Sequence, residues 1–140
     1  MLMTSRILVV DDEVSIAETL CMILEMSGYK AYSAGSGLQA IATIEEGCCP
    51  DLLLSDVMMP GLNGFETALR ITARWPNCRL LFFSGYATSP EMLQLSENLR
   101  DRGHDFEVVA KPLHPTLLLE KVREALCGKG GQAIALGSTP

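Results

Sequence analysis

The 140-residue chain has no apolar run that approaches the roughly 18 residues of a membrane-spanning helix. Its first residues lack the basic-then-apolar layout of a signal peptide. A formal charge of −6 argues against a nucleic-acid-binding surface, because phosphate contacts need clustered Lys and Arg. These absences favour a cytoplasmic globular protein without membrane insertion. The length suits one α/β domain and is too short for two ordinary ones.

Cysteines at metal-binding spacing are also missing. The five cysteines are odd in number and contain no Cys-x-x-Cys motif, which argues against a disulfide framework and against a zinc site. The two histidines, His104 and His114, fall in segments expected at the surface. No Ser-His or Cys-His pairing is therefore indicated, and any covalent chemistry must use another kind of nucleophile.

What the chain does contain is a regular alternation of short apolar runs and helical patterns. The apolar runs predict buried strands at 6–10, 52–54, 79–83 and 106–110, and a short, weaker strand is predicted at 30–34. Apolar residues at helical spacing predict helices at 14–27, 38–46, 65–75, 90–102 and 114–126. Five strands alternating with five helices predict an α/β fold, a parallel sheet covered on both faces. After Cys127 the composition becomes rich in Gly and small residues, so we expect a domain over 1–127 and a flexible tail over 128–140.

Polar residues stand at the ends of four predicted strands. Asp11 and Asp12 follow the first strand, Asp56 follows the third, Ser84 the fourth and Lys111 the fifth. Right-handed crossovers place the carboxyl ends of parallel strands at one edge of the sheet, where ligands bind in such folds. We therefore expect these five side chains to converge in one pocket.

The residue types in this pocket suggest phosphoryl chemistry. Three carboxylates close together repel one another and need a cation to stay ionised, and an oxygen-only set suits Mg²⁺. The Ser84 hydroxyl and the Lys111 ammonium add donors for anionic oxygens. Asp56 is the best candidate for the nucleophile, since a carboxylate can attack phosphorus to give an aspartyl phosphate. The residues alone thus predict magnesium-dependent phosphorylation of Asp56.

Four segments together resemble the receiver domains of bacterial response regulators. They are Ile-Leu-Val-Val-Asp-Asp-Glu at 7–13, Asp-Val-Met-Met-Pro-Gly-Leu-Asn-Gly at 56–64, Ser-Gly-Tyr at 84–86 and Lys-Pro at 111–112. The resemblance extends from about Arg6 to Leu126. It implies a two-component or phosphorelay protein, apparently a stand-alone receiver, with a doubly wound, flavodoxin-like sheet in the strand order 2-1-3-4-5.

The resemblance also implies a role for each residue of the magnesium site. Asp12 would bind the ion directly, Asp11 would act largely through water, and Asp56 would contribute as both ligand and phosphoacceptor. The backbone carbonyl of Met58 would complete the protein ligands.

For the phosphoryl group itself, the resemblance implies that Ser84 contacts a phosphoryl oxygen and moves on activation. Lys111 would pair with the phosphoryl charge, and its bond to Pro112 would be cis. The chain would be a switch rather than an enzyme, with only self-phosphotransfer and autodephosphorylation.

Partners are implied in the same way. A sensor histidine kinase or histidine phosphotransfer protein would donate the phosphoryl group, docking at the first helix. A downstream protein would read the fourth helix, fifth strand and fifth helix of a monomer or a phosphorylation-linked dimer.

The chain departs from the family pattern at Val108, where members usually carry Tyr or Phe. That ring turns inward when the hydroxyl moves, and valine cannot make this swing. Phe106 lies two residues earlier and so on the same face of the strand. We expect intact phosphorylation with a readout that relies on the fourth helix, and a mobile, partner-specific loop at 87–90.

Other interpretations stay open from the sequence. Asp11 and Asp12 could cap the first helix, Ser84 could cap the fourth, and Lys111 could be an ordinary strand-end charge. A receiver excised from a longer hybrid kinase is another possibility.

Two alternatives of another class are weaker. A haloacid dehalogenase-type phosphatase also uses an aspartyl nucleophile, but its general acid two residues later is replaced here by Met58. A flavin or nucleotide module would want a Gly-rich or hydroxyl-rich loop after the first strand. The acids at 11–13 stand there instead and would repel a phosphate unless a metal intervened.

Overall fold

The computed structural model describes residues 4–85 and 89–127, so the predictions for Tyr86, for residues 87 and 88 of the 87–90 loop and for the tail lie outside the described residues. Strands and helices alternate along the chain as predicted. In order they are β1 (Arg6–Val10), α1 (Val14–Met26), β2 (Lys30–Ala34), α2 (Gly37–Glu45), β3 (Leu52–Asp56), α3 (Gly64–Arg74), β4 (Arg79–Ser84), α4 (Pro90–Asp101), β5 (Phe106–Ala110) and α5 (Pro115–Cys127).

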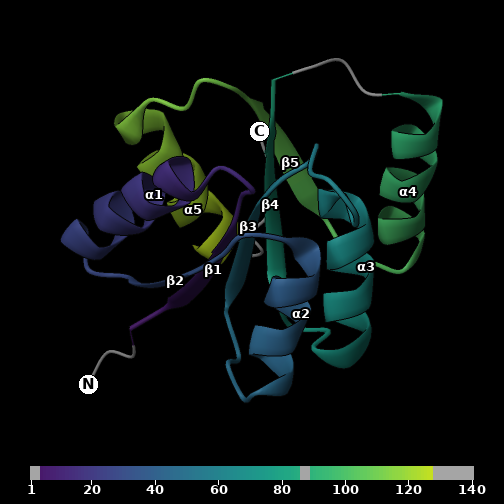
Figure 1. Ribbon diagram of the computed structural model, residues 1–140, viewed down its shortest axis with the longest axis horizontal. Coiled ribbons are helices and arrows are strands. Elements are labelled where there is room, and N and C mark those ends of the chain that lie inside the picture. Colours follow the sequence, from purple (N-terminus) through teal and green to yellow (C-terminus); the bar gives the residue numbers. More distant parts are fainter. Residues whose placement is uncertain (1–3, 86–88, 128–140) are drawn as a thin grey trace.

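The five strands form one parallel sheet in the order β2-β1-β3-β4-β5. Helices α1 and α5 lie on one face of the sheet and α2, α3 and α4 on the other, as Figure 1 shows. This is the doubly wound, flavodoxin-like arrangement that was predicted. It brings the carboxyl ends of β1, β3, β4 and β5 to the same edge.

The two faces of the sheet bury two separate apolar clusters, because successive strand residues point to opposite sides. On β1, Ile7 and Val9 pack with residues of α1 and α5, whereas Leu8 and Val10 pack with residues of α2, α3 and α4. All five residues of the central strand β3 are buried. This double coverage explains why the strands are continuous apolar runs rather than alternating ones.

Three phenylalanines join α3, β4 and β5 on the second face. The ring of Phe82 lies 4.7 Å from that of Phe65 and 5.2 Å from that of Phe106. The guanidinium of Arg100, near the end of α4, sits 4.1 Å from the centre of the Phe106 ring, a favourable cation–π distance. Val108 stands beside Phe82 in the β-ladder and is 42% exposed. Its neighbour Phe106 is therefore the aromatic residue that ties β5 to α4.

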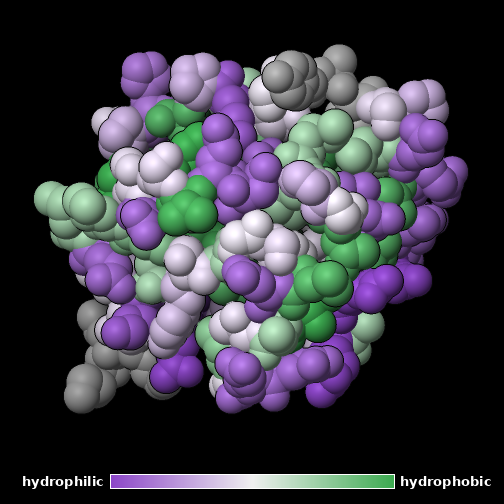
Figure 2. All heavy atoms as spheres, in the orientation of Figure 1, coloured by the Kyte–Doolittle hydropathy of each residue, from purple (hydrophilic) through white to green (hydrophobic). Residues whose placement is uncertain are grey.

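The surface gives no sign of a membrane-spanning segment. Within the described ranges, every helix is too short or too polar to span a bilayer. Hydrophilic residues cover most of the face seen in Figure 2, and the apolar residues there form small separate patches.

Helix α2 packs tightly against α3 at Gly37, where α2 begins. A Cβ atom added to this residue would lie 2.2 Å from the Thr67 hydroxyl and 2.9 Å from the Cβ of Leu62. Thr67 is buried, and its hydroxyl already donates a hydrogen bond to the carbonyl of Asn63. Position 37 therefore has no room for a side chain.

We expect Gly37→Ala to lower the free energy of unfolding by about 1–3 kcal/mol, since the packed helices must move apart. The matched control is Gly35→Ala, whose new Cβ would meet only the end of the Gln39 side chain; it should change stability by less than about 0.5 kcal/mol. Urea unfolding of both variants measures the difference. Equal stability of the two would show that α2 and α3 are not in contact at this point.

Candidate functional site

Three carboxylates gather at the carboxyl edge of the sheet, as the strand ends predicted. Asp11 and Asp12 follow β1, and Asp56 ends the adjacent strand β3. One oxygen from each lies within 4.8 Å of the others. Asp11 is fully buried, Asp56 is 4% exposed and Asp12 is exposed. Two of the three carboxylates are thus buried, and the cluster is open to solvent at Asp12.

The two carboxylate oxygens of Asp11 differ: among the described residues, one accepts a hydrogen bond and the other does not. Its Oδ1 accepts a hydrogen bond of 2.9 Å from the backbone N–H of Glu13. Its Oδ2 is buried and has no hydrogen-bond partner among the described residues. Burial raises the pKa of Asp11 above its ordinary 3.8, the Glu13 N–H and Lys111 oppose this rise, and the charges of Asp56 and Asp12 add to it. A buried oxygen without a donor beside two other acids is where a cation would fit.

Among the described residues, Lys111 is the cation in contact with this cluster. Its Nζ lies 2.9 Å from Asp56 Oδ2 and 3.9 Å from Asp11 Oδ2. Burial lowers the pKa of Lys111, but the hydrogen bond to Asp56 and the charges of Asp56 and Asp11 outweigh it, so the pKa is raised above 10.5. The ammonium is therefore charged at neutral pH. The interpretation of Lys111 as an ordinary strand-end charge is wrong.

The backbone around Asp56 is tightly folded. Asp56 Oδ1 accepts a hydrogen bond of 3.1 Å from the N–H of Met58, and the N–H of Gly64 donates to the carbonyl of Val57 at 2.9 Å. A Cβ at Gly64 would lie 2.3 Å from the Asp56 carbonyl oxygen. Only glycine lets α3 begin this close to the acceptor.

The start of α3 is also fixed by its cap. Asn63 and Glu66 form reciprocal hydrogen bonds between side chain and backbone, each 2.9 Å long. Such a capping box holds the first helical turn in place. The loop that follows Asp56 is therefore anchored at its far end.

Ser84 ends β4 at the same edge, and its carbonyl accepts a hydrogen bond of 3.0 Å from the N–H of Lys111. The cap of α4 is Ser89, which accepts from the N–H of Met92, so the alternative in which Ser84 caps α4 is wrong. The Lys111-Pro112 bond is cis, as predicted. Contact of the Ser84 hydroxyl with a ligand stays a prediction.

Asp11 and Asp12 do not cap α1 either. The N-cap residue is Glu13, and α1 has no side-chain cap. The Met58 carbonyl as a metal ligand stays a prediction, since the structure shows only that its N–H contacts Asp56. The side chain of Met58 is 45% exposed beside the cluster.

An apolar groove of about 620 Å³ opens next to the cluster, between α1 and the segment that joins β5 to α5. Sequence reasoning does not predict it, because its two walls are about a hundred residues apart in the chain. Lys111 reaches both this groove and the carboxylates. The groove is lined by Glu13, Ser15, Ile16, Thr19, Leu20, Ile23, Phe83, Lys111, Pro112, Leu113 and Pro115.

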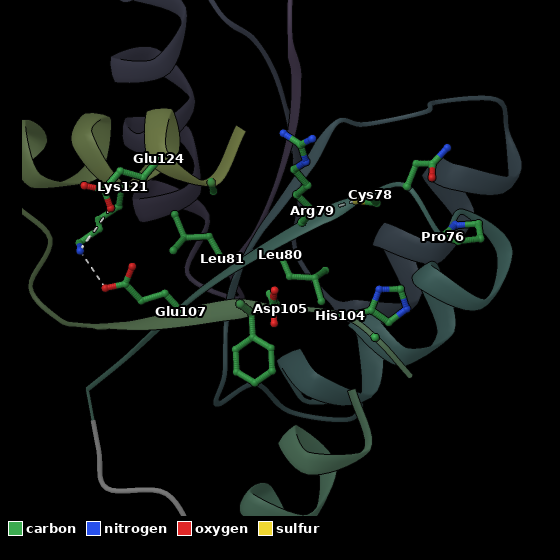
Figure 3. A pocket seen from close by; sticks show the side chains of 14 residues that line it. Pro76, Cys78, Arg79, Leu80, Leu81, His104, Asp105, Glu107, Lys121 and Glu124 are labelled. Carbon is green, nitrogen blue, oxygen red and sulfur yellow. Dashed lines mark hydrogen bonds and ion pairs between the residues drawn. The ribbon is translucent and has the colours of Figure 1, made fainter. Parts of the chain in front are cut away.

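A second hollow of about 610 Å³ lies at the beginning of β4 and β5, the end of the sheet opposite to the carboxylates. Figure 3 shows Lys121 of α5 within it, with contacts to Glu107 and Glu124. These contacts are 2.8 Å and 3.6 Å long. Among the described residues, the three carboxylates that could together hold a metal ion lie at the Asp56 edge and not in this hollow.

Comparisons with known proteins agree with this geometry. The family model described as "Response regulator receiver domain" matches residues 7–123. A solved receiver domain protein (CheY-like) from Methanospirillum hungatei JF-1 superposes with a TM-score of 0.78 at 30% identity, covering 91% of this chain and 98% of that one.

Two curated relatives have similar sequences. The DNA-binding response regulator MtrA of Mycolicibacterium paratuberculosis is 33% identical over 126 residues, which cover 89% of this chain and 52% of the relative. Sporulation initiation phosphotransferase F of Bacillus subtilis is 30% identical over 125 residues, covering 89% of this chain and 93% of the relative. The chain thus spans about half the length of the first of these relatives and nearly all of the second. With the matched strand ends gathered around Asp56, the chain belongs to the response regulator receiver domain family, whose members are phosphoryl-accepting switches of two-component signalling.

Proposed function

We propose that this chain takes a phosphoryl group from a phosphohistidine onto Asp56 with the help of Mg²⁺, and that the modified form binds a downstream protein. The observation that carries the proposal is the cluster of Asp11, Asp12 and Asp56 with the ammonium of Lys111 held 2.9 Å from the acceptor. The haloacid dehalogenase alternative finds no support, because Met58 cannot act as an acid.

The donor set fits magnesium. Its ligands are hard oxygens, and the orphaned Oδ2 of Asp11 is a buried acceptor that needs a cation. Asp11, Asp12, Asp56 and the Met58 carbonyl would hold the ion. When bound, the ion would offset the negative charge of the carboxylates and of the phosphoryl oxygens.

Four residues of this chain have separate roles in the transfer of the phosphoryl group. A carboxylate oxygen of Asp56 forms a bond to phosphorus while the P–N bond of the donor breaks and its electron pair stays on the imidazole. Lys111 exchanges its contact with Asp56 for one with a phosphoryl oxygen. The Ser84 hydroxyl donates to another of these oxygens, and the Met58 N–H holds the acceptor in place.

The groove beside α1 fits the donor protein. It is apolar, and Lys111 lies at the point where it meets the acceptor site. A histidine-bearing helix laid into it would bring its side chain to Asp56. The cytoplasm is the compartment in which we expect this transfer.

The readout should pass through α4. Phe106 is held between Phe82 and Arg100, and the exposed Val108 has no ring to move inward. A rearrangement at Ser84 should therefore reach the surface at α4 rather than at β5.

Incubation with acetyl phosphate should add a single phosphoryl group to the native chain when Mg²⁺ is present and none when it is chelated. Asp56→Asn should remain unmodified under both conditions, because the nucleophile is gone. Intact mass spectrometry measures the adduct. An adduct of equal yield on Asp56→Asn would place the acceptor elsewhere and overturn the proposal.

Asp11→Asn should raise the free energy of unfolding by roughly 1 kcal/mol in magnesium-free buffer, because it removes a buried like charge. Burial raises the pKa of Asp11 above 3.8 in the folded chain, so the folded chain holds the Asp11 proton more tightly than the unfolded chain does. The contribution of Asp11 to the free energy of unfolding therefore falls as the pH rises from 3.8 through the raised value. Asp11→Asn should lose this pH-dependent contribution to stability, and it should also lose the stabilisation by added Mg²⁺. Thermal unfolding with and without the ion tests both points.

The exposed Glu120→Gln on α5 is the control for the loss of one negative charge. It should retain the stabilisation by Mg²⁺. If Asp11→Asn were stabilised by Mg²⁺ as strongly as the native chain, Asp11 would not be a ligand.

Hydrogen exchange on phosphorylation should change most in α4 and little in β5, because the aromatic cluster holds Phe106 in place. Asp56→Asn treated in the same way is the control. Ordinary protection changes in β5 with none in α4 would contradict a readout through α4.

A further inference from the structure

A fourth acid, Glu13, stands beside the carboxylate cluster and has no role in the transfer described above. Its backbone is fixed on both sides: its N–H donates to Asp11 Oδ1 at 2.9 Å, and its carbonyl accepts from Ile16 and Ala17 at the start of α1, both at 3.1 Å. Its side chain does not cap this helix. Within residues 4–85 and 89–127, no hydrogen bond or ion pair involves its carboxylate.

Glu13 faces the apolar groove rather than the solvent alone. It is the one carboxylate among the described residues that line the groove. Lys111 lines it as well, and the negative charge of Glu13 contributes to the raised pKa of that lysine. The groove therefore holds a negative and a positive group within electrostatic reach of each other, and apolar residues such as Ile16 and Leu113 also line it.

A phosphorylated imidazole carries the complementary pair of charges. Its phosphoryl group is anionic, and its ring becomes cationic when the second ring nitrogen is protonated. As the P–N bond breaks, its electron pair goes to the first nitrogen. The ring leaves as neutral imidazole if the second nitrogen keeps its proton, and as the much poorer leaving group imidazolate if it does not. A carboxylate that accepts a hydrogen bond from this N–H favours the protonated, reactive ring.

We infer that Glu13 is a positioning residue for the phosphoryl donor. Its carboxylate accepts a hydrogen bond from the free ring N–H of a phosphorylated imidazole that lies in the groove, while the phosphoryl group faces Lys111 and Asp56. This inference rests on the proposed function, since it concerns the donor of the same transfer. Asp11 and Asp12 cannot take the role, because Asp11 is fully buried and neither lines the groove.

The test compares two small donors on the same protein. Phosphoimidazole has a ring N–H when its second nitrogen is protonated, whereas acetyl phosphate has none, and both should deliver the phosphoryl group to Asp56 in the presence of Mg²⁺. At a pH well above the pKa of the donor ring, Glu13→Gln should slow phosphorylation by phosphoimidazole roughly tenfold, the effect of about one pKa unit on the donor ring. The rate with acetyl phosphate should stay within about twofold. Intact mass measured against time gives both rates.

Two further variants sharpen the comparison. Glu18→Gln removes an exposed acid of α1 that does not line the groove, and it should leave both rates unchanged. Glu13→Asp keeps the charge on a shorter side chain and should recover part of the phosphoimidazole rate without changing the other.

Several results would overturn the inference. A faster reaction of Glu13→Gln with both donors would show that Glu13 only repels anions, and an equal slowing with both would show a general effect on the site. Either result leaves the acceptor role of Asp56 intact. A native chain that accepts phosphoryl from neither donor would instead overturn the proposed function, and this inference with it.

Discussion

The compensation of two buried carboxylates is the constraint on which this structure depends. Asp11 and Asp56 stand at the ends of adjacent strands, and the ammonium of Lys111 faces both, 3.9 Å from the first and 2.9 Å from the second. One positive charge cannot neutralise two buried acids and the exposed Asp12 beside them. The carboxyl edge of the sheet therefore carries negative charge that is not compensated. Binding of a cation, or transfer of the Lys111 contact to a phosphoryl group, changes the electrostatic free energy of this edge.

The acceptor is connected to the surface by continuous packing. The Asp56 carbonyl oxygen leaves no room for a Cβ atom at Gly64, and the next residue, Phe65, packs its ring against Phe82. Phe106 completes the aromatic cluster and carries Arg100 of α4 on its face. Interiors packed this closely pass on small displacements rather than absorbing them. Val108 is an exposed aliphatic residue of β5 and is not part of this aromatic cluster.

Most of this arrangement follows from the sequence. Residues 52–54 are an uninterrupted apolar run, soon followed by the acid Asp56, and such a run fits only a sheet covered on both faces. The convergence of Asp11, Asp12, Asp56, Ser84 and Lys111 then follows from the shared direction of parallel strands. The groove beside α1 was not predictable, because its walls meet only after folding. The helix caps were ambiguous for a related reason, since Ser84 and Ser89 both precede α4 and only the backbone path selects the second.

The separation of the site residues along the chain has a consequence for how the site forms. Asp56 and Lys111 are 55 residues apart, and their contact requires β5, the last strand and an edge of the sheet. Contacts between such distant residues form late, because the loop they close must be ordered first. An edge strand can also detach locally while the remaining strands stay paired. The carboxylates can thus come together before Lys111 reaches them. The charge of the site therefore depends on whether β5 is paired with the rest of the sheet.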